Sequence, residues 1–196
     1  MSELTRALAD RVAALLAAHP VQDAHPPGYR QAAVLLPLYA AAAGPHLLLT
    51  QRTEAVPTHK GQVSLPGGGY REGDADLCAT ALRETEEEVG LHPEDVRVVG
   101  RLDDAITVAS RFVVRPFVAV VPSAYAFRPD PREIAALIHL PVAALLRAPF
   151  RAEQWVREGR RVPVLVQEYD GHVVWGLTAR ILQQFVERVA RPLAGC

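Results

Sequence analysis

Cysteine is scarce in this sequence, which contains only Cys78 and Cys196 among its 196 residues. Cys78 falls inside an expected helix and Cys196 lies at the C-terminus, so a disulfide framework of the kind found in small secreted proteins is not expected. This cysteine usage fits a reducing compartment. We therefore expect a cytoplasmic location.

Long apolar runs and a strong charge of one sign are also lacking. No apolar stretch approaches the roughly 18 residues of a membrane span, and Arg6, Asp10 and Arg11 interrupt the apolar stretch at residues 4–18. The net charge is −1, so the chain has no general basic footprint for nucleic acid. We expect neither a membrane nor a nucleic acid as partner, whereas one phosphorylated ligand held in a pocket remains compatible with this charge.

The sequence does have the composition of a globular domain. Hydrophobic residues make up 49% and charged residues 22% of the chain, which is enough for one sizeable core and argues against disorder. No repeat or low-complexity linker divides it. We expect a single domain over residues 1–196, with an amphipathic helix and a proline-rich connector at 1–28 and a helix at 178–190.

Apolar runs bounded by turn signals predict the strands of a sheet. They lie at residues 32–38, 46–51, 96–106, 112–121, 134–140, 162–169 and 172–175. The first two runs are nearly continuous in apolar residues, which is typical of central strands covered on both faces. Pro116 predicts a bulge or an edge in the fourth run. Asp170 and Gly171 predict a hairpin turn, and Pro141 opens a short helix that reaches residue 147.

An acidic helix end at residues 84–90 departs from this ordinary pattern. Four glutamates crowd the last turns before Gly90, although like charges repel on a helix face and a helix C-terminus already carries partial negative charge. Glu84, Glu87 and Glu88 share one face, while Glu86 falls between them and is expected to point into solvent. Carboxylates grouped in this way suit Mg²⁺ or Mn²⁺, which commonly bridge to substrate phosphates.

The residues around the glutamates define the two ends and the opposite face of this helix. Asp74 is expected to cap the helix, and Gly90 to end it. The opposite face carries residues spaced for packing on a sheet, namely Leu77, Ala81, Leu82, Thr85 and Val89.

Residues 53–66 form a long polar loop, a kind of loop that is usually functional, although a solvated surface loop is the alternative. Arg111 and Arg115 are either phosphate contacts or surface charges.

Residues 68–91 resemble the signature of the Nudix hydrolases, G-x5-E-x7-R-E-U-x-E-E-x-G-U, in which U is bulky and apolar. The stretch from Arg83 to Leu91 matches the second half of that signature, apart from Thr85 at a U position. In the first half, Ala75 stands where the early glutamate is expected. Asp74 beside it is a partial stand-in for that carboxylate.

The residues upstream resemble a motif of the coenzyme A pyrophosphatases, L-L-T-x-R-[SA]-x3-R-x3-G-x3-F-P-G-G. The matching positions are Leu48, Leu49, Thr50, Arg52, Gly61, Pro66, Gly67 and Gly68. Thr53 replaces serine or alanine, Leu65 replaces phenylalanine, and Pro57 stands where an arginine is expected. The missing arginine removes one implied phosphate contact, which Arg52, His59 or Lys60 would then supply.

The resemblance implies an α/β/α sandwich around a mixed β-sheet, with the loop–helix–loop of the signature beside the sheet. It implies a divalent-metal-dependent hydrolysis of the diphosphate of coenzyme A to 4′-phosphopantetheine and adenosine 3′,5′-bisphosphate. The implied ligands of Mg²⁺ or Mn²⁺ are Glu84, Glu87, Glu88 and Gly68. The implied catalytic residues are Glu87, Glu84 and Arg83, with Glu87 the first candidate for the general base and a loop residue the alternative. The implied substrate contacts are Arg52, His59, Lys60, Gly61, Gly67 and Gly69.

Two other functions remain open. One is a Nudix hydrolase of another nucleoside diphosphate derivative, such as NADH or ADP-ribose. The other is a non-catalytic nucleotide-binding module of the same fold, which the complete set of repulsive glutamates disfavours. Members of the family often form homodimers, and the apolar stretches near the two termini are the candidates for such an interface here.

Overall fold

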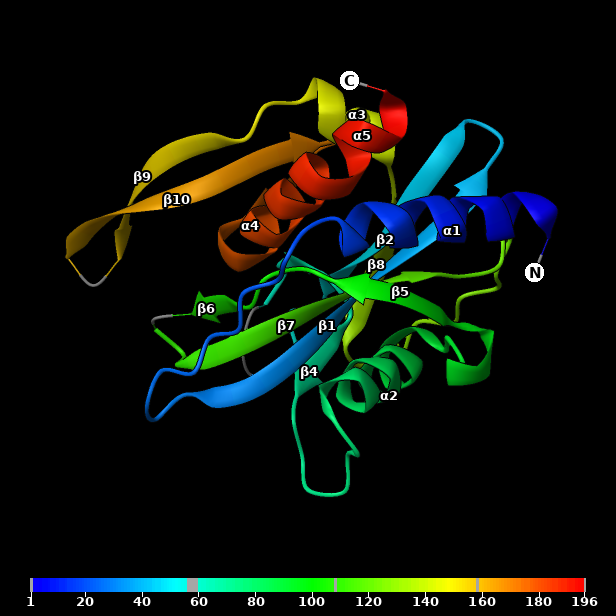
Figure 1. The fold of residues 1–196 in the computed structure, drawn as a ribbon. Helices are drawn as coiled ribbons and strands as arrows, with labels where there is room; N and C mark the ends of the chain where they lie inside the picture. The colour runs from blue at the N-terminus through cyan, green and yellow to red at the C-terminus, as the bar shows by residue number, and fades with distance from the viewer. Residues whose placement is uncertain (1, 56–59, 108, 158, 196) are drawn as a thin grey trace.

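A mixed sheet of eight strands forms the centre of the fold (Figure 1). The computed structural model describes residues 2–55, 60–107, 109–157 and 159–195. The main path of the sheet runs β3-β2-β1-β7-β5, and β4 pairs with β1, β6 with β7 and β8 with β2. The strands are β1 (Arg30–Ala41), β2 (Gly44–Arg52), β3 (Val63–Ser64), β4 (Gly67–Gly69), β5 (Arg97–Arg101), β6 (Ala105–Thr107), β7 (Phe112–Val120) and β8 (Ile134–Pro141).

Helices cover both faces of this sheet, as the apolar runs of β1 and β2 predict. Along β1, Leu36 and Leu38 belong to one apolar cluster with residues of α1 (Glu3–Ala17) and α4 (Gly176–Phe185). Leu35 and Tyr39 belong to a second cluster with residues of α2 (Leu77–Val89). Because successive strand residues point to opposite faces, these two clusters lie on the two sides of the sheet. Figure 1 shows α1 and α2 on either side of it, which confirms the predicted α/β/α sandwich.

A second, three-stranded sheet of order β11-β10-β9 adjoins this body. It consists of β9 (Arg151–Arg157), β10 (Arg160–Tyr169) and β11 (His172–Trp175). The predicted hairpin at Asp170 and Gly171 is confirmed, since Tyr169 pairs with His172. Strand β9 was not predicted, because its sequence is largely polar and shows no apolar run.

The prediction of one strand over residues 96–106 was wrong. The chain forms β5 and β6 instead, and both pair with β7, Arg101 opposite Phe117 and Ala105 opposite Val114. Pro116 faces the gap between them, where its missing N–H costs no ladder hydrogen bond to β5 or β6. The expected bulge at Pro116 is wrong, because β7 pairs with β1 through this residue without a register shift, whereas the position resembles an edge on its other side, where β5 and β6 end before reaching it. Strand β7 lies inside the sheet and its neighbour is interrupted.

The helices at the two ends of the chain form close to where the sequence predicts them. Ser2 caps α1 by accepting the N–H of Thr5 over 3.2 Å. The predicted C-terminal helix begins earlier than expected as α4, passes through a π-helical turn (Val186–Ala190) and ends as α5 (Arg191–Ala194). The short helix after Pro141 is α3 (Val142–Arg147). In the described part of the chain no helix has the length and apolar character that crossing a membrane requires.

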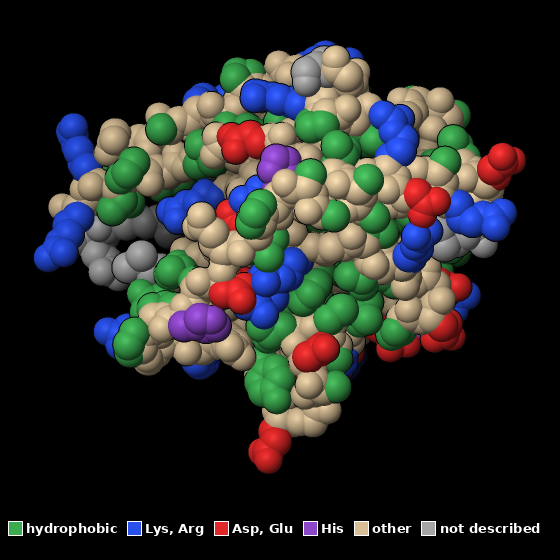
Figure 2. Space-filling view, in the orientation of Figure 1, with side chains coloured by type: hydrophobic (Ala, Val, Ile, Leu, Met, Phe, Trp, Pro, Cys, Tyr) green, Lys and Arg blue, Asp and Glu red, His purple; other side chains and the backbone are tan. Residues whose placement is uncertain are grey.

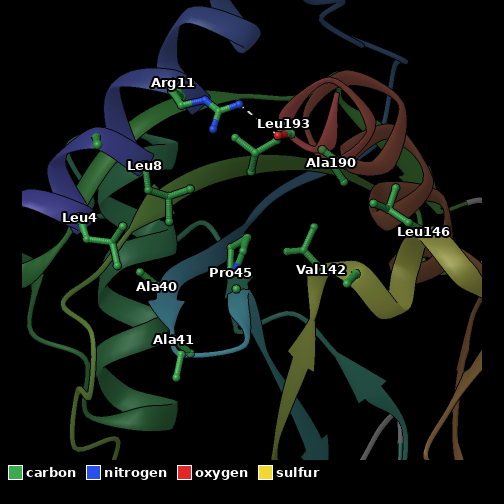
Figure 3. Close-up of a pocket in the computed structure, with 15 residues that line it drawn as sticks. Leu4, Leu8, Arg11, Ala40, Ala41, Pro45, Val142, Leu146, Ala190 and Leu193 are labelled. Carbon is green, nitrogen blue, oxygen red and sulfur yellow. Dashed lines mark hydrogen bonds between the residues drawn. The ribbon is translucent and has the colours of Figure 1, made fainter. Parts of the chain in front are cut away.

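Two surface features fall outside the acidic helix. On the face shown in Figure 2, cationic and anionic side chains are intermixed rather than gathered into one basic patch. A hollow of about 480 Å³ lies between α1, the β1–β2 turn, α3 and the C-terminal helix, and its lining is mostly aliphatic (Figure 3). Its lining includes Ala40 and Pro45, whereas the glycines of β4 pair with residues 32–34 of the same strand β1. The hollow is therefore separate from the glycines.

Candidate active site

Three glycines bring the backbone of β4 close to the start of β1. Gly67 pairs with Val34 and Gly68 with Ala33 in an antiparallel ladder. Gly67 has a φ of 146°, and a Cβ there would lie 2.3 Å from the carbonyl oxygen of Ala33. Only glycine fits such a position. The glycines therefore leave a length of backbone without side chains beside α2, partly buried at Gly67 and Gly68 and exposed at Gly69.

The start of α2 differs from the prediction. Asp76 is the N-cap, since its Oδ1 accepts the N–H of Ala79 over 2.8 Å. Asp74, the predicted cap, instead accepts two hydrogen bonds from Arg83, from Nε over 2.8 Å and from Nη2 over 2.9 Å. A carboxylate and a guanidinium match each other in this paired geometry, and Asp76 is left to cap the helix. The predicted end of the helix is confirmed, because Gly90 is left-handed with a φ of 66°.

Arg83 connects the glycine strand to the acidic helix. Besides Asp74, it donates to Oε1 of Glu84 over 2.6 Å, to Oε2 of Glu87 over 3.2 Å and to the carbonyl of Gly69 over 3.3 Å. The hydrogen bonds from Arg83 hold the pKa of Asp74 well below its usual range, and those from Asp74 raise the pKa of Arg83. A carboxylate one position before Ala75 thus lies against Arg83.

Glu88 is a buried carboxylate at the centre of the site. It is 5% exposed. Its Oε2 accepts the N–H of Gly67 over 3.2 Å, and its Oε1 accepts Nη1 of Arg52 over 3.2 Å. Burial raises the pKa of Glu88 to about 7, the two hydrogen-bond donors oppose this rise, and the charge of Glu84 adds to it. A carboxylate in this setting remains costly to ionise despite Arg52, and further positive charge would reduce that cost.

The remaining glutamates of the helix face different surroundings. A Cβ built on Gly68 would lie 2.4 Å from Oε2 of Glu84, so the Glu84 carboxylate lies directly against the glycine backbone. Glu87 is half exposed and accepts a hydrogen bond from Arg71 over 2.8 Å. Glu86 points outward, as predicted, and contacts His92 over 2.8 Å. That contact raises the pKa of His92.

The chemistry of these side chains suits a hard divalent cation, because the glutamates offer only oxygen. Within the described residues, however, no three histidine, cysteine, aspartate or glutamate side chains stand together closely enough to hold a metal ion. Arginine side chains contact the carboxylates instead, Arg83 at Glu84 and Glu87 and Arg52 at Glu88. The predicted ligand set therefore stays a prediction. Its glutamate donors are of the right chemical type, and Gly68 adds no side chain between its backbone and Glu84.

The predicted substrate contacts are only partly described. Arg52 ends β2 and reaches Glu88, whereas Lys60 is exposed in the polar loop and Gly61 follows it with a φ of 64°. His59 and Pro57 lie outside the described residues. Arg115, one of the two candidate phosphate contacts, pairs with a carboxylate of the chain, since its guanidinium donates two hydrogen bonds of 2.8 Å to Asp104.

Glu133 is a carboxylate near the site that the sequence did not single out. Its Oε2 accepts Nη2 of Arg52 over 3.4 Å. It reaches Arg52 because β8 pairs with β2, with Ile134 opposite Arg52. No motif or spacing in the sequence reveals this pairing.

A family model for the NUDIX domain matches residues 28–159 of the chain. The chain belongs to the Nudix family. An uncharacterized Nudix hydrolase NudL of Citrobacter koseri is 37% identical over 82% of this chain and 83% of its own length. A protein of the same name from Klebsiella pneumoniae (strain 342) is also 37% identical, over 88% of this chain and 90% of its own. As a Nudix hydrolase, the protein is an enzyme that acts on nucleoside diphosphate derivatives, and members of this family generally use divalent metal ions.

Solved structures agree with this Nudix fold. A C. elegans Ap4A hydrolase in a binary complex has a TM-score of 0.55 at 18% identity, over 85% of this chain and 99% of its own. A MutT/nudix family protein from Enterococcus faecalis has a TM-score of 0.56 at 14% identity, over 99% of this chain and 75% of its own. At such low identity these likenesses establish the fold alone.

Proposed function

We propose that this Nudix hydrolase cleaves the diphosphate of coenzyme A into 4′-phosphopantetheine and adenosine 3′,5′-bisphosphate, with Mg²⁺ or Mn²⁺ as cofactor. The contact between Arg52 and Glu88 carries the proposal. Arg52 belongs to the motif that resembles coenzyme A pyrophosphatases, Glu88 belongs to the Nudix signature, and Nη1 of the first lies 3.2 Å from Oε1 of the second. This contact supports a single site to which the upstream motif and the acidic helix both contribute.

Glu84, Glu87 and Glu88, together with the backbone carbonyl of Gly68, are the proposed ligands of the ion. When bound, the ion neutralises diphosphate charge and lowers the pKa of a bound water. Arg83 orients the carboxylates of Glu84 and Glu87, which it already contacts. Such support of a ligand typically matters about 10- to 100-fold in activity.

The remaining roles follow from position and charge. The glycines of β4 allow the diphosphate to approach the backbone, and Gly67 and Gly69 are proposed contacts. Four further contacts are proposed in β2 and the polar loop, namely Arg52, His59, Lys60 and Gly61. Glu87 is half exposed and is the proposed general base. It accepts the proton of the attacking water while the new P–O bond forms and the bridging P–O bond breaks.

A cytoplasmic location is also proposed, because of the low cysteine content. A homodimer is proposed because members of the family often form one. Neither is needed for the chemistry above. Sedimentation of the purified chain tests the homodimer directly, and a monomer at micromolar concentration contradicts it.

The function is tested by incubating the purified chain with coenzyme A and Mg²⁺ or Mn²⁺ and identifying the products by mass. The variants E87Q and E88Q are expected to keep the fold and lose at least about 100-fold in turnover. E86Q is the matched control on the same helix, because Glu86 faces outward, and it is expected to retain activity. Near-normal turnover by both E87Q and E88Q contradicts the assignment of the glutamates. Cleavage of NADH or ADP-ribose without cleavage of coenzyme A refutes the substrate.

A further inference from the structure

Arg52 lies between two carboxylates from different parts of the chain. Its Nη1 donates to Glu88 over 3.2 Å and its Nη2 donates to Glu133 over 3.4 Å. Glu88 comes from the acidic helix, whereas Glu133 precedes β8 and belongs to neither sequence motif. The guanidinium is therefore shared between a carboxylate that binds the metal ion in the proposed function and one that does not.

Backbone hydrogen bonds fix Glu133 relative to both partners. Its N–H donates to the carbonyl of Asp130 over 3.0 Å, and its carbonyl accepts the N–H of Thr53 over 2.8 Å. The N–H of Asp130 donates to the carbonyl of Glu88 over 2.9 Å. The turn that carries Glu133 is thus tied to the last turn of α2 and to the residue after Arg52. These hydrogen bonds place the Glu133 side chain beside the guanidinium.

Glu88 would hold Arg52 less well if a divalent cation occupied its carboxylate. Both of its carboxylate oxygens already accept a hydrogen bond, from Arg52 and from the N–H of Gly67. A cation on the same buried carboxylate competes for its negative charge and repels the neighbouring guanidinium. Glu133 contacts the other terminal nitrogen of Arg52, and its side chain is 51% exposed at the edge of the site.

We propose that Glu133 is a positioning residue that keeps the Arg52 guanidinium at the diphosphate when the metal ion occupies Glu88. The inference rests on the proposed function, because it needs Glu88 as a metal ligand and Arg52 as a phosphate contact. Glu133 touches no reacting atom in this scheme. It strengthens diphosphate binding in the presence of the metal ion and contributes little in its absence, when Glu88 still holds Arg52.

The test compares E133Q, which removes the charge and keeps the size of the side chain, with wild type. E86Q is the matched control, because Glu86 is 43% exposed against 51% for Glu133 and pairs with His92 away from the site. Calorimetry measures the binding of inorganic pyrophosphate with Mg²⁺ and with a chelator. With Mg²⁺ we expect E133Q to bind roughly threefold to tenfold more weakly, E133D to recover part of the loss, and E86Q to match wild type. With the chelator, E133Q and wild type are expected to agree.

Several outcomes overturn the inference. Equal affinity of wild type and E133Q for pyrophosphate in Mg²⁺ does so, as does an equal loss with and without the ion, which a purely structural defect would produce. Absence of Mg²⁺-dependent pyrophosphate binding in wild type overturns it as well. On whichever nucleoside diphosphate derivative wild type cleaves, E133Q is expected to raise KM and keep kcat. A fall in kcat at unchanged KM contradicts a positioning role.

Pyrophosphate contains no part of coenzyme A beyond the diphosphate itself. Failure of wild type to cleave coenzyme A therefore refutes the proposed substrate and leaves the calorimetric result on Glu133 to be judged separately.

Discussion

Replacing Glu88 by glutamine is expected to make the metal-free protein progressively more stable relative to wild type as the pH rises, while it removes most of the activity. Glu88 is buried, and burial raises its pKa from an ordinary value of 4.5 to about 7. At low pH the carboxyl is protonated in the folded and the unfolded chain alike. As the pH rises above 4.5, the unfolded chain ionises at its ordinary pKa, whereas the folded chain keeps the proton on the buried carboxyl until the pH approaches about 7.

The size of this effect follows from the two pKa values. A raised folded pKa contributes stability that is fully present below pH 4.5 and is lost as the pH rises through about 7. The gap corresponds to roughly 3 kcal/mol in the free energy of unfolding. The glutamine that replaces Glu88 in E88Q never ionises, so the stability of E88Q relative to wild type should grow by about 2 to 3 kcal/mol between pH 5 and pH 8.

Urea unfolding of both proteins at several pH values, with a chelator present throughout, measures this difference. Comparing the two proteins cancels the other titrating groups, because both chains share them. Glutamine presents an amide to Arg52, which lowers the stability of E88Q by an amount that is the same at every pH. If the free energy of unfolding of E88Q minus that of wild type stays flat or falls between pH 5 and pH 8, ionisation of Glu88 does not destabilise the folded chain and the reasoning is refuted.

Three further variants test the rest of the site. G68A is expected to keep the fold and lose about 10- to 100-fold in turnover, because its Cβ would displace the Glu84 carboxylate, whose Oε2 lies 2.4 Å away. Wild-type turnover of G68A contradicts the position of Glu84. D74A is expected to lose activity because Arg83 loses its paired carboxylate, whereas D76A loses only a helix cap, about 1 kcal/mol of stability, and keeps turnover. Urea unfolding and initial rates distinguish them, and a D76A variant less active than D74A would reverse the two roles.

Local patterns in the sequence predict most of the main sheet and the acidic helix. The apolar runs of β1 and β2 predict burial on both faces, because two helix layers require apolar residues on both sides. Gly90 marks the end of α2, because glycine readily adopts the left-handed conformation that ends a helix. Such features depend on neighbouring residues along the chain, so spacing alone reveals them.

Features set by distant parts of the chain escaped prediction. Asp74 and Asp76 are equally good caps by type, and the choice between them depends on Arg83, which takes Asp74. Glu133 reaches Arg52 across 81 positions of sequence only through the pairing of β8 with β2. Strand β9 has no apolar run of its own and forms because its backbone pairs with that of β10. In each case the outcome depends on a contact with a residue or strand that only the folded structure brings near.

A single competition reaction tests the central claim, which is that the diphosphate of coenzyme A is the bond this Nudix hydrolase cleaves. Coenzyme A, NADH and ADP-ribose are supplied together at equal concentration with Mg²⁺, and the products are identified by mass at early times. The account predicts that 4′-phosphopantetheine and adenosine 3′,5′-bisphosphate appear first. Products of NADH or ADP-ribose in clear excess over 4′-phosphopantetheine would contradict it.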